Sequence, residues 1–400
     1  MTALFTLAVA KPLAVIFALQ TALTMGAYSF PVVIPVAAKD LGIEPESVGF
    51  FVATIYIVAM LVGLYSGRIL ARFGPTRLFQ ILLAFSAVGA LVLTLGSVWA
   101  VVLAAVLVGC STGPMNPSGS QVLARVTSPK TRALVFSLKQ CATPTGGILA
   151  GAVLPALILV YDWQVAMLAV AAFVAIMVLA VPFGRLGRKD EISPGEKPAS
   201  PAQALRTVLA DRSLRAVTIT GFGLALCQMG LATYLVVFLW REAGYTPAEA
   251  GFIFAVLHIS GIISRVFLGL IADRLLSARL VLALIGITLS IAFLAIPHMT
   301  MAWPIAAVYG VIAVAGASGN GWVGLYFAEL ARLAPEDRVA EVAAGSQFVT
   351  YLGIVCGPLT FGALLQATDS YLICFSVLTA IALISALLSL LKPPSRPVPE

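Results

Sequence analysis

Arginine and histidine occur in a stretch of this sequence that is otherwise apolar. Arg265 lies eight residues before Asp273, which is about 12 Å along a helix at 1.5 Å per residue. If the stretch crosses a membrane, an unpaired arginine at that depth costs about 2.5–3.5 kcal/mol. No aspartate or glutamate lies deep in any apolar stretch. We therefore interpret Arg265 as a binding residue for an anion; the alternative is that backbone carbonyls or a packing carboxylate hold it.

A second internal cation, Lys139, lies seven residues after Arg132, about 10 Å along a helix. It is interpreted as further positive charge for the anion, or as a gate. The alternative is that its long stem carries the ammonium group to the membrane surface. His258 lies two turns before Arg265 and has an ordinary pKa near neutrality, so it is the candidate for proton coupling. Packing or hydrogen bonding in the core explains His258 equally well.

Composition indicates an integral membrane protein. Hydrophobic residues make up 60% of the 400 residues and charged residues only 10%, whereas about a quarter of a soluble protein is charged. Apolar stretches of about 20 residues, each long enough to cross a hydrocarbon core of about 30 Å, recur along the whole sequence. They predict an all-α fold with twelve transmembrane helices, over residues 12–37, 48–70, 78–97, 100–123, 133–159, 163–183, 214–240, 248–272, 280–297, 302–328, 341–366 and 371–391.

The distribution of lysine and arginine predicts the orientation. Of these 24 residues, 20 lie at the two termini or on the connections that share their side, and only Lys39 and Arg241 lie on the opposite side. Cytoplasmic loops carry such an excess, so both termini are expected in the cytoplasm of a multi-pass protein of the inner membrane. The net charge of +7 follows from this bias and does not indicate nucleic-acid binding. A signal peptide is the competing interpretation of the first apolar stretch, which is too long for one.

Patterns typical of enzymes and metal sites are missing from the sequence. All five cysteines lie within predicted spans and form no CxxC pair, so neither disulfides nor a metal site is expected. His258 and His298 are 40 residues apart, and no HExxH motif occurs. We therefore expect no enzymatic activity and no cofactor.

One block of sequence occurs twice. Residues 41–50 are matched by 243–252 at an offset of 202, and Gly109 is matched by Gly316 at an offset of 207. Shared residues are interpreted as scaffold. Positions that differ, such as Gly63 against Arg265 at the 202 offset, are the better candidates for function.

The repeat predicts the domain organisation. We expect two homologous six-helix bundles, residues 1–183 and 214–392, joined by a cytoplasmic linker over 184–213. Residues 202–209 of the linker have the pattern of a short amphipathic helix. The proline-rich tail, 393–400, is expected to be disordered.

Two six-helix halves with a basic loop after the second helix of each resemble the major facilitator superfamily of transporters. The loop signature of that family is glycine, three residues, aspartate and arginine, with further basic residues. The second copy keeps Gly269, Asp273 and Arg274, whereas the first has Ala71 before Arg72. The resemblance implies an inward-side latch at Asp273, near the positive N-terminal end of the fifth span. It assigns gating or structural roles to Gly269, Asp273, Arg274, Arg72 and Arg332.

The spacing from Arg265 to Gly269 also resembles the eighth helix of monocarboxylate and oxalate/formate carriers, in which an arginine at this position binds the substrate carboxylate. Val266 stands where those carriers often have proline, and Gly261 replaces an acidic partner. A guanidinium binds carboxylate through two nitrogens but also binds nitrate, phosphate or sulfonate. In this fold spans 5 and 8 meet, so Lys139 and Arg265 could converge on one ligand.

The resemblance further implies that spans 1, 4, 7 and 10 line the substrate cavity, and polar residues occur on them at helical spacing. Each could instead form a helix–helix hydrogen bond worth about 0.6 kcal/mol. Span 4 is expected to break between Gly113 and Pro117, which would permit the bending that transport requires. The predicted substrate-binding residues are Arg265, Lys139, Gln20, Tyr28, Asn116, Gln140, Gln228, Tyr234, Asn320 and Gln347.

These patterns predict a secondary transporter that imports a small organic anion, a carboxylate, together with protons by alternating access. Its expected partners are the anion, protons and membrane lipid, and the fold generally works as a monomer. A proton-coupled exporter of drugs or metabolites is the rival interpretation, but it would need a membrane-embedded carboxylate, which the spans lack. An inorganic anion transporter (for nitrate or cyanate), a non-transporting sensor and a lipid scramblase stay open as alternatives.

Overall fold

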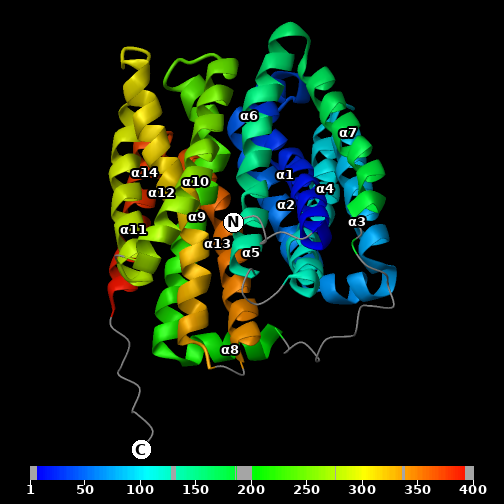
Figure 1. Cartoon of the computed structure of the whole chain (residues 1–400). Helices are drawn as coiled ribbons and strands as arrows, with labels where there is room; N and C mark the ends of the chain where they lie inside the picture. The colour runs from blue at the N-terminus through cyan, green and yellow to red at the C-terminus, as the bar shows by residue number, and fades with distance from the viewer. Residues whose placement is uncertain are drawn as a thin grey trace, which may run out of the picture. The chain divides into compact units, whose positions relative to one another are not determined.

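The computed structural model describes residues 7–127, 132–184, 186, 201–274, 276–335 and 338–391, and these residues are built from helices (Figure 1). The α-helices are α1 (Leu7–Leu41), α2 (Val48–Gly63), α3 (Ser66–Leu93), α4 (Val98–Val126), α5 (Arg132–Gln140), α6 (Ala142–Val160), α7 (Trp163–Ala180), α8 (Pro201–Ala210), α9 (Arg212–Arg241), α10 (Pro247–Arg274), α11 (Ala278–Ala295), α12 (Ile305–Leu333), α13 (Val339–Thr368) and α14 (Tyr371–Leu390). Short 3-10 helices include η1 (Pro45–Ser47), η2 (Val181–Gly184) and η4 (Ile296–His298).

Twelve helices within the described ranges are long and apolar enough to cross a membrane, and each corresponds to one predicted span. The predicted fold class is therefore confirmed. The helix predicted at 202–209 is also confirmed as α8, which packs against α13. The two helices can approach closely because Gly345 has no side chain. A Cβ atom at this residue would collide with the Ala204 backbone. The rest of the predicted linker falls largely, and the predicted tail entirely, outside the described residues.

The boundary between the second and third spans differs from the prediction. The second span was predicted to continue to residue 70, but α2 ends at Gly63 and α3 begins at Ser66. The predicted basic loop is itself helical except at Gly74, which has a φ of 75° and a ψ of 164°. This left-handed φ favours glycine. Pro75 follows and starts the next helical segment, where its missing N–H is not needed.

The fifth span is divided, and the fourth is continuous. Helices α5 and α6 are separated at Cys141, because Pro144 has no N–H for the carbonyl of Gln140, four residues earlier. The break predicted between Gly113 and Pro117 is wrong, since α4 continues through both of its prolines. Membrane helices tolerate proline where neighbouring helices cover the carbonyl groups that it leaves without a partner.

Contacts between Cα atoms group the chain into two compact units. The first unit comprises Met1–Glu196 with Ala232–Ile259, and the second comprises Lys197–Leu231 with Ser260–Glu400. In the first unit α1 packs against α4 and α6, and α4 packs against α2 and α3. In the second unit α11 packs against α12 and α14. The predicted domain limits at 183 and 214 follow the sequence repeat and stay a prediction.

Glycines allow α2 and α4 to approach closely within the first unit. A Cβ atom on Gly109 would meet the carbonyl oxygen of Ile55, and one on Gly113 would meet the backbone of Ala59. Gly63 faces the same helix, since its Cβ would lie 3.3 Å from the carbonyl oxygen of Gly113. Small residues at this spacing are typical of tight membrane-helix packing.

Candidate functional site

Three predicted substrate-binding residues form one network in the second unit. The Nε atom of Arg265, on α10, donates a hydrogen bond of 2.9 Å to the carbonyl oxygen of Asn320, on α12. The side-chain oxygen of Asn320 accepts from Nε2 of Gln228, on α9, also at 2.9 Å. Trp322, which the sequence did not single out, donates to the side-chain oxygen of Gln228 at 3.0 Å. Arg265 and Gln228 are half-buried, whereas Asn320 and Trp322 are buried.

The indole of Trp322 favours one orientation of the Gln228 amide. The indole N–H donates both to the Gln228 side-chain oxygen and to the Gly319 carbonyl, each at 3.0 Å, and this arrangement turns the Gln228 nitrogen towards Asn320. The Asn320 nitrogen in turn lies 3.4 Å from the carbonyl oxygen of Gly316. One N–H of Gln228 is used by Asn320, which leaves the other as a further donor in the network. The network therefore combines a guanidinium with amide donors, a composition that suits an anionic ligand.

Glycine is needed where α10 meets α12. A Cβ atom on Gly261 would lie 2.6 Å from Cβ of Asn320. On the facing helix, a Cβ on Gly321 would lie 2.7 Å from the hydroxyl oxygen of Ser264. This close approach brings the Asn320 carbonyl within reach of Arg265, one turn beyond Gly261.

Lys139 does not reach the surface. It is 0% exposed, and its ammonium group donates to α4 at three places: the Asn116 carbonyl oxygen at 2.8 Å, the Asn116 side-chain oxygen at 2.5 Å and the Ser120 hydroxyl at 2.7 Å. The stem borders Gly119, whose Cβ would lie 3.4 Å from Cε of the lysine. The structure thus joins two predicted residues, Lys139 and Asn116, within the first unit. Ser120 and Gly119 complete the set and were missed by the sequence analysis.

Gln20 connects α1 to α6 near this lysine. Its nitrogen donates to the Thr143 hydroxyl at 2.9 Å, and Thr21 donates to the Ala142 carbonyl at 3.3 Å. The side-chain oxygen of Gln20 is buried and accepts no hydrogen bond from the described residues. One turn before Gln20 on α1, Ile16 lies beside Gly119: its Cγ2 atom is 3.1 Å from the position that a Cβ of residue 119 would take.

His258 lies in an aromatic cluster in the first unit. Its ring centroid is 4.7 Å from those of both Tyr28 and Phe254, and Tyr28 and Phe254 are 5.8 Å apart. A Cβ atom on Gly147 of α6 would overlap the His258 ring. His258 is only 1% exposed, so the packing role considered for it has direct geometric support.

Tyr234 is committed to a different contact. Its hydroxyl donates to the Glu46 carbonyl of η1 at 3.1 Å. Arg241, at the end of the same helix, lies 3.5 Å from the Glu46 carboxylate and 3.8 Å from that of Glu44. Tyr234 therefore helps to hold the last turns of α9 against η1 within the first unit.

The other predicted residues are dispersed. Gln140 is half-buried in the last turn of α5, and Gln347 on α13 bonds to Tyr351. Arg72 is exposed, with its guanidinium 5.5 Å from the Phe73 ring. Gly269, Asp273 and Arg274 belong to the last turns of α10, and their side chains lie outside the described part of the chain.

Arg332 pairs with Glu329, a buried carboxylate near the end of α12 that the sequence did not single out. Two guanidinium nitrogens of Arg332 donate to Glu329 at 2.7 and 2.8 Å. Arg279 of α11 bonds to the same carboxylate and also donates to the Leu391 carbonyl. Two arginines thus neutralise one buried glutamate and tie together the ends of α11, α12 and α14.

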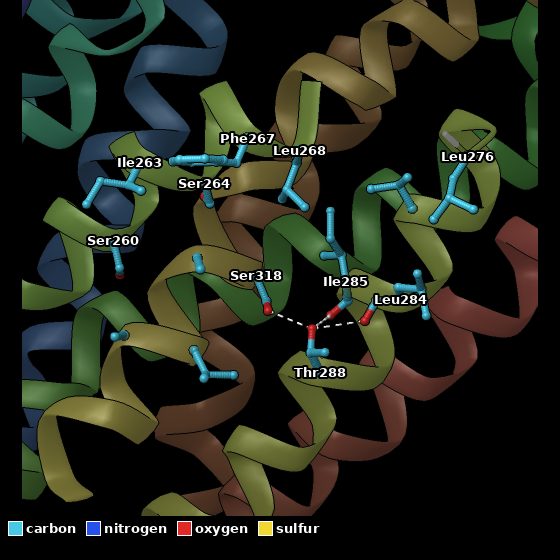
Figure 2. A pocket seen from close by; sticks show the side chains of 14 residues that line it. Ser260, Ile263, Ser264, Phe267, Leu268, Leu276, Leu284, Ile285, Thr288 and Ser318 are labelled. Carbon is cyan, nitrogen blue, oxygen red and sulfur yellow. Dashed lines mark hydrogen bonds between the residues drawn. The ribbon is translucent and has the colours of Figure 1, made fainter. Parts of the chain in front are cut away.

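A separate groove of about 600 Å³ lies between α10, α11 and α12 (Figure 2). Its walls are mainly apolar, and exposed side chains such as Phe267 and Ile263 stand at it. The Thr288 hydroxyl at its floor is already bonded to Ser318 at 2.7 Å and to helix carbonyls, as Figure 2 shows. Arg265 does not line this groove, which suits an apolar chain better than an anion.

The described residues include twelve helices long and apolar enough to cross a membrane, as expected for a multi-pass integral membrane protein, and the second unit carries a polar network with a guanidinium. The family model of the Major Facilitator Superfamily matches residues 16–358, and the chain belongs to this family of secondary transporters. Its members are transporters and not enzymes.

Solved structures agree with this fold. A bacterial homologue of the human lysosomal transporter Spinster, in an inward-facing and occupied conformation, has a TM-score of 0.75 at 14% identity, covering 94% of this chain and 95% of that one. A POT family transporter in complex with 5-aminolevulinic acid has a TM-score of 0.75 at 14% identity, covering 94% of each chain. A peptide transporter POT in complex with sulfate scores 0.74 at 16% identity, covering 95% and 94%. No curated protein sequence matches the chain.

Proposed function

We propose that this protein carries a small organic anion, a carboxylate, across the cytoplasmic membrane by alternating access, with Arg265 as the anion-binding residue. The observation that carries the proposal is the hydrogen bond from Nε of Arg265 to the Asn320 carbonyl. Because Nε donates to a backbone oxygen of α12, this bond restricts the rotation of the guanidinium group. A guanidinium in a fixed plane is suited to a carboxylate, which it binds through two parallel hydrogen bonds.

The neighbouring amides support the same assignment. Gln228 is oriented by Trp322 so that its nitrogen, and not its oxygen, faces Asn320. The spacing of Arg265 and Gly269 adds the resemblance to monocarboxylate and oxalate/formate carriers. Two structural neighbours bear on the substrate class only by their ligands, 5-aminolevulinic acid in one and sulfate in another.

Uptake together with protons is part of the proposal, because it lets a proton gradient drive an anion inward. The 20 lysines and arginines that share a side with the termini support a cytoplasmic location for both termini. Asp273, Arg274 and Gly269 would form the inward-side latch of the second half, and the ion pair of the exposed Arg332 with the buried Glu329 would support it; Arg72 would have the gating or structural role in the corresponding segment of the first half.

Uptake into proteoliposomes tests the proposal. The purified protein is given a panel of monocarboxylates and dicarboxylates, with nitrate as an inorganic anion, under an inward proton gradient. We expect accumulation of a carboxylate by the unmodified protein, and loss of it in Arg265→Ala. Arg206→Ala, which removes an exposed arginine of α8, is the matched control and should transport normally. Parallel carboxylate uptake by correctly folded Arg265→Ala would refute the anion site, and uptake of nitrate alone would favour the inorganic alternative.

A further inference from the structure

Lys139 and three positions around it differ together between the two halves of the sequence. At the offset of 207 residues, Lys139, Asn116, Gly119 and Ser120 correspond to Ser346, Val323, Tyr326 and Phe327. In the second unit the Tyr326 hydroxyl donates to the Ser346 carbonyl at 3.3 Å and lies 3.1 Å from the Thr350 hydroxyl. The second half therefore fills the equivalent space with a ring and a small hydroxyl, and it places no charge there.

The first half builds a cradle that fits an ammonium group. A protonated lysine has three N–H donors and no acceptor. Lys139 meets three acceptors, two on Asn116 and one on Ser120, at 2.5–2.8 Å. Gly119 leaves room for the lysine stem beside them. In the arrangement of α4 and α5 seen here, the cradle holds the protonated form.

The acceptors are all neutral, so the charge of Lys139 is not balanced by them. None of the ion pairs in the described ranges includes this lysine. Charged or titratable side chains on the helices that pack around it are Lys11, Tyr28, Lys39 and Asp40 on α1 and Cys110 and Arg125 on α4, and none of them bonds to it. Cys141 adjoins it in sequence, α6 carries no charged residue, and the Arg132 side chain of α5 lies outside the description.

A charge buried in a membrane span without a counter-charge is expensive. The second half shows that the same fold packs without it, so packing alone does not explain the lysine. From these observations we infer that Lys139 is the proton-binding residue of the transport cycle. This inference rests on the proposed proton-driven uptake of an anion, and it assigns to Lys139 the coupling role first considered for His258.

The proton step is a reversible transfer to water. When α4 and α5 separate, Asn116 and Ser120 leave the ammonium group and water reaches it. The N–H bond then breaks, the nitrogen keeps the electron pair as a neutral amine, and the proton joins water as hydronium. Gln20, whose buried side-chain oxygen accepts no hydrogen bond from the described residues, lies one turn from Ile16 and offers an acceptor to that water.

Lys139→Arg provides the sharpest test, because a guanidinium keeps its proton at every working pH. The variant is locked in the proton-loaded charge state. We expect exchange of labelled for unlabelled substrate across the membrane to persist, while accumulation driven by a proton gradient is lost. His258→Gln is the contrasting variant and should keep gradient-driven accumulation. Gradient-driven accumulation by Lys139→Arg at the rate of the unmodified protein would overturn the inference.

A second variant transplants the neutral arrangement of the second half. It combines Asn116→Val, Gly119→Tyr, Ser120→Phe and Lys139→Ser, so that the space is filled and the charge removed. We expect loss of substrate-induced proton uptake, measured with a pH-sensitive dye on the purified protein. Proton uptake equal to that of the unmodified protein would overturn the inference even if this variant transports slowly. If the unmodified protein accumulates no carboxylate, the proposed function itself fails, and the inference that rests on it fails as well.

Discussion

Arg265 and Asn320 are hydrogen-bonded at the positions where the first half of the chain has Gly63 and Gly113. The correspondence holds at the two offsets of the repeat, 202 for α2 and α10 and 207 for α4 and α12. In the first unit the Gly63 Cβ position lies 3.3 Å from the Gly113 carbonyl, so the helices leave no space for an arginine. The same helix pair is thus used for close packing in one half and for a charged polar site in the other.

Arg265→Lys should separate charge from geometry at this site. A lysine keeps the positive charge but cannot form two parallel bonds to a carboxylate. Removing one partner of a buried charged pair costs about 2–5 kcal/mol, so we expect substrate affinity to fall roughly 30-fold or more in Arg265→Ala and less in Arg265→Lys. Binding of the transported carboxylate, measured by calorimetry, checks the order. Equal affinities for the two variants would argue that only the charge matters.

Trp322→Phe should weaken substrate binding without abolishing transport. The phenylalanine cannot donate to Gln228, so the amide is free to turn its oxygen toward Asn320. A hydrogen bond of this kind between membrane helices is worth about 0.6 kcal/mol, which predicts a rise in KM of roughly threefold with kcat unchanged. Trp99→Phe, at a tryptophan that is 82% exposed, is the control. An unchanged KM in Trp322→Phe would show that the amide orientation does not affect the site.

Gly147→Ala should destabilise the aromatic cluster, because its methyl group would overlap the His258 ring. Overpacking of this kind costs about 1–3 kcal/mol. We expect a lower Tm in detergent, measured by nanoscale fluorimetry. Adding His258→Ala makes space for the methyl group, so the effects of the two substitutions should not be additive. Full additivity would mean that the overlap is relieved elsewhere.

The two arginines around Glu329 should differ in their importance for stability. The Arg279 side chain is 11% exposed and that of Arg332 is 60% exposed. Breaking a buried pair costs about 3–5 kcal/mol, whereas an exposed pair contributes about 0–1 kcal/mol. Arg279→Ala should therefore lower the Tm clearly, and Arg332→Ala only slightly. The reverse order would place the stabilising contact on the exposed arginine.

The fold could be predicted from the sequence because hydrophobicity alone determines where a chain can cross a membrane. All twelve spans follow from that rule. The end of the second span was not predicted correctly. Apolar residues continue past Gly63, so hydrophobicity gives no sign of the turn between α2 and α3. The expected break in span 4 failed for a different reason. Neighbouring backbone approaches α4 closely enough for its prolines to remain within a helix.

Partners in the candidate site were harder to predict than its charged residues. Arg265 and Lys139 stand out as charges in apolar spans. Trp322, Ser120 and Gly119 look like ordinary membrane residues, and their roles depend on how each helix is rotated about its own axis. Comparison of the two halves at the 207 offset was the signal that could have found Gly119 and Ser120, since both correspond to aromatic residues.

The cradle of Lys139 also places a constraint on the history of the duplication. A Cβ atom on Gly119 would already lie 3.4 Å from the lysine stem, so a tyrosine ring at 119 and a lysine at 139 compete for one space. A half that carries the ring cannot acquire the lysine until the ring has gone. The substitutions that convert one arrangement into the other must therefore occur in a certain order. The aromatic ring is lost before the lysine is gained, or the lysine is lost before the ring is gained.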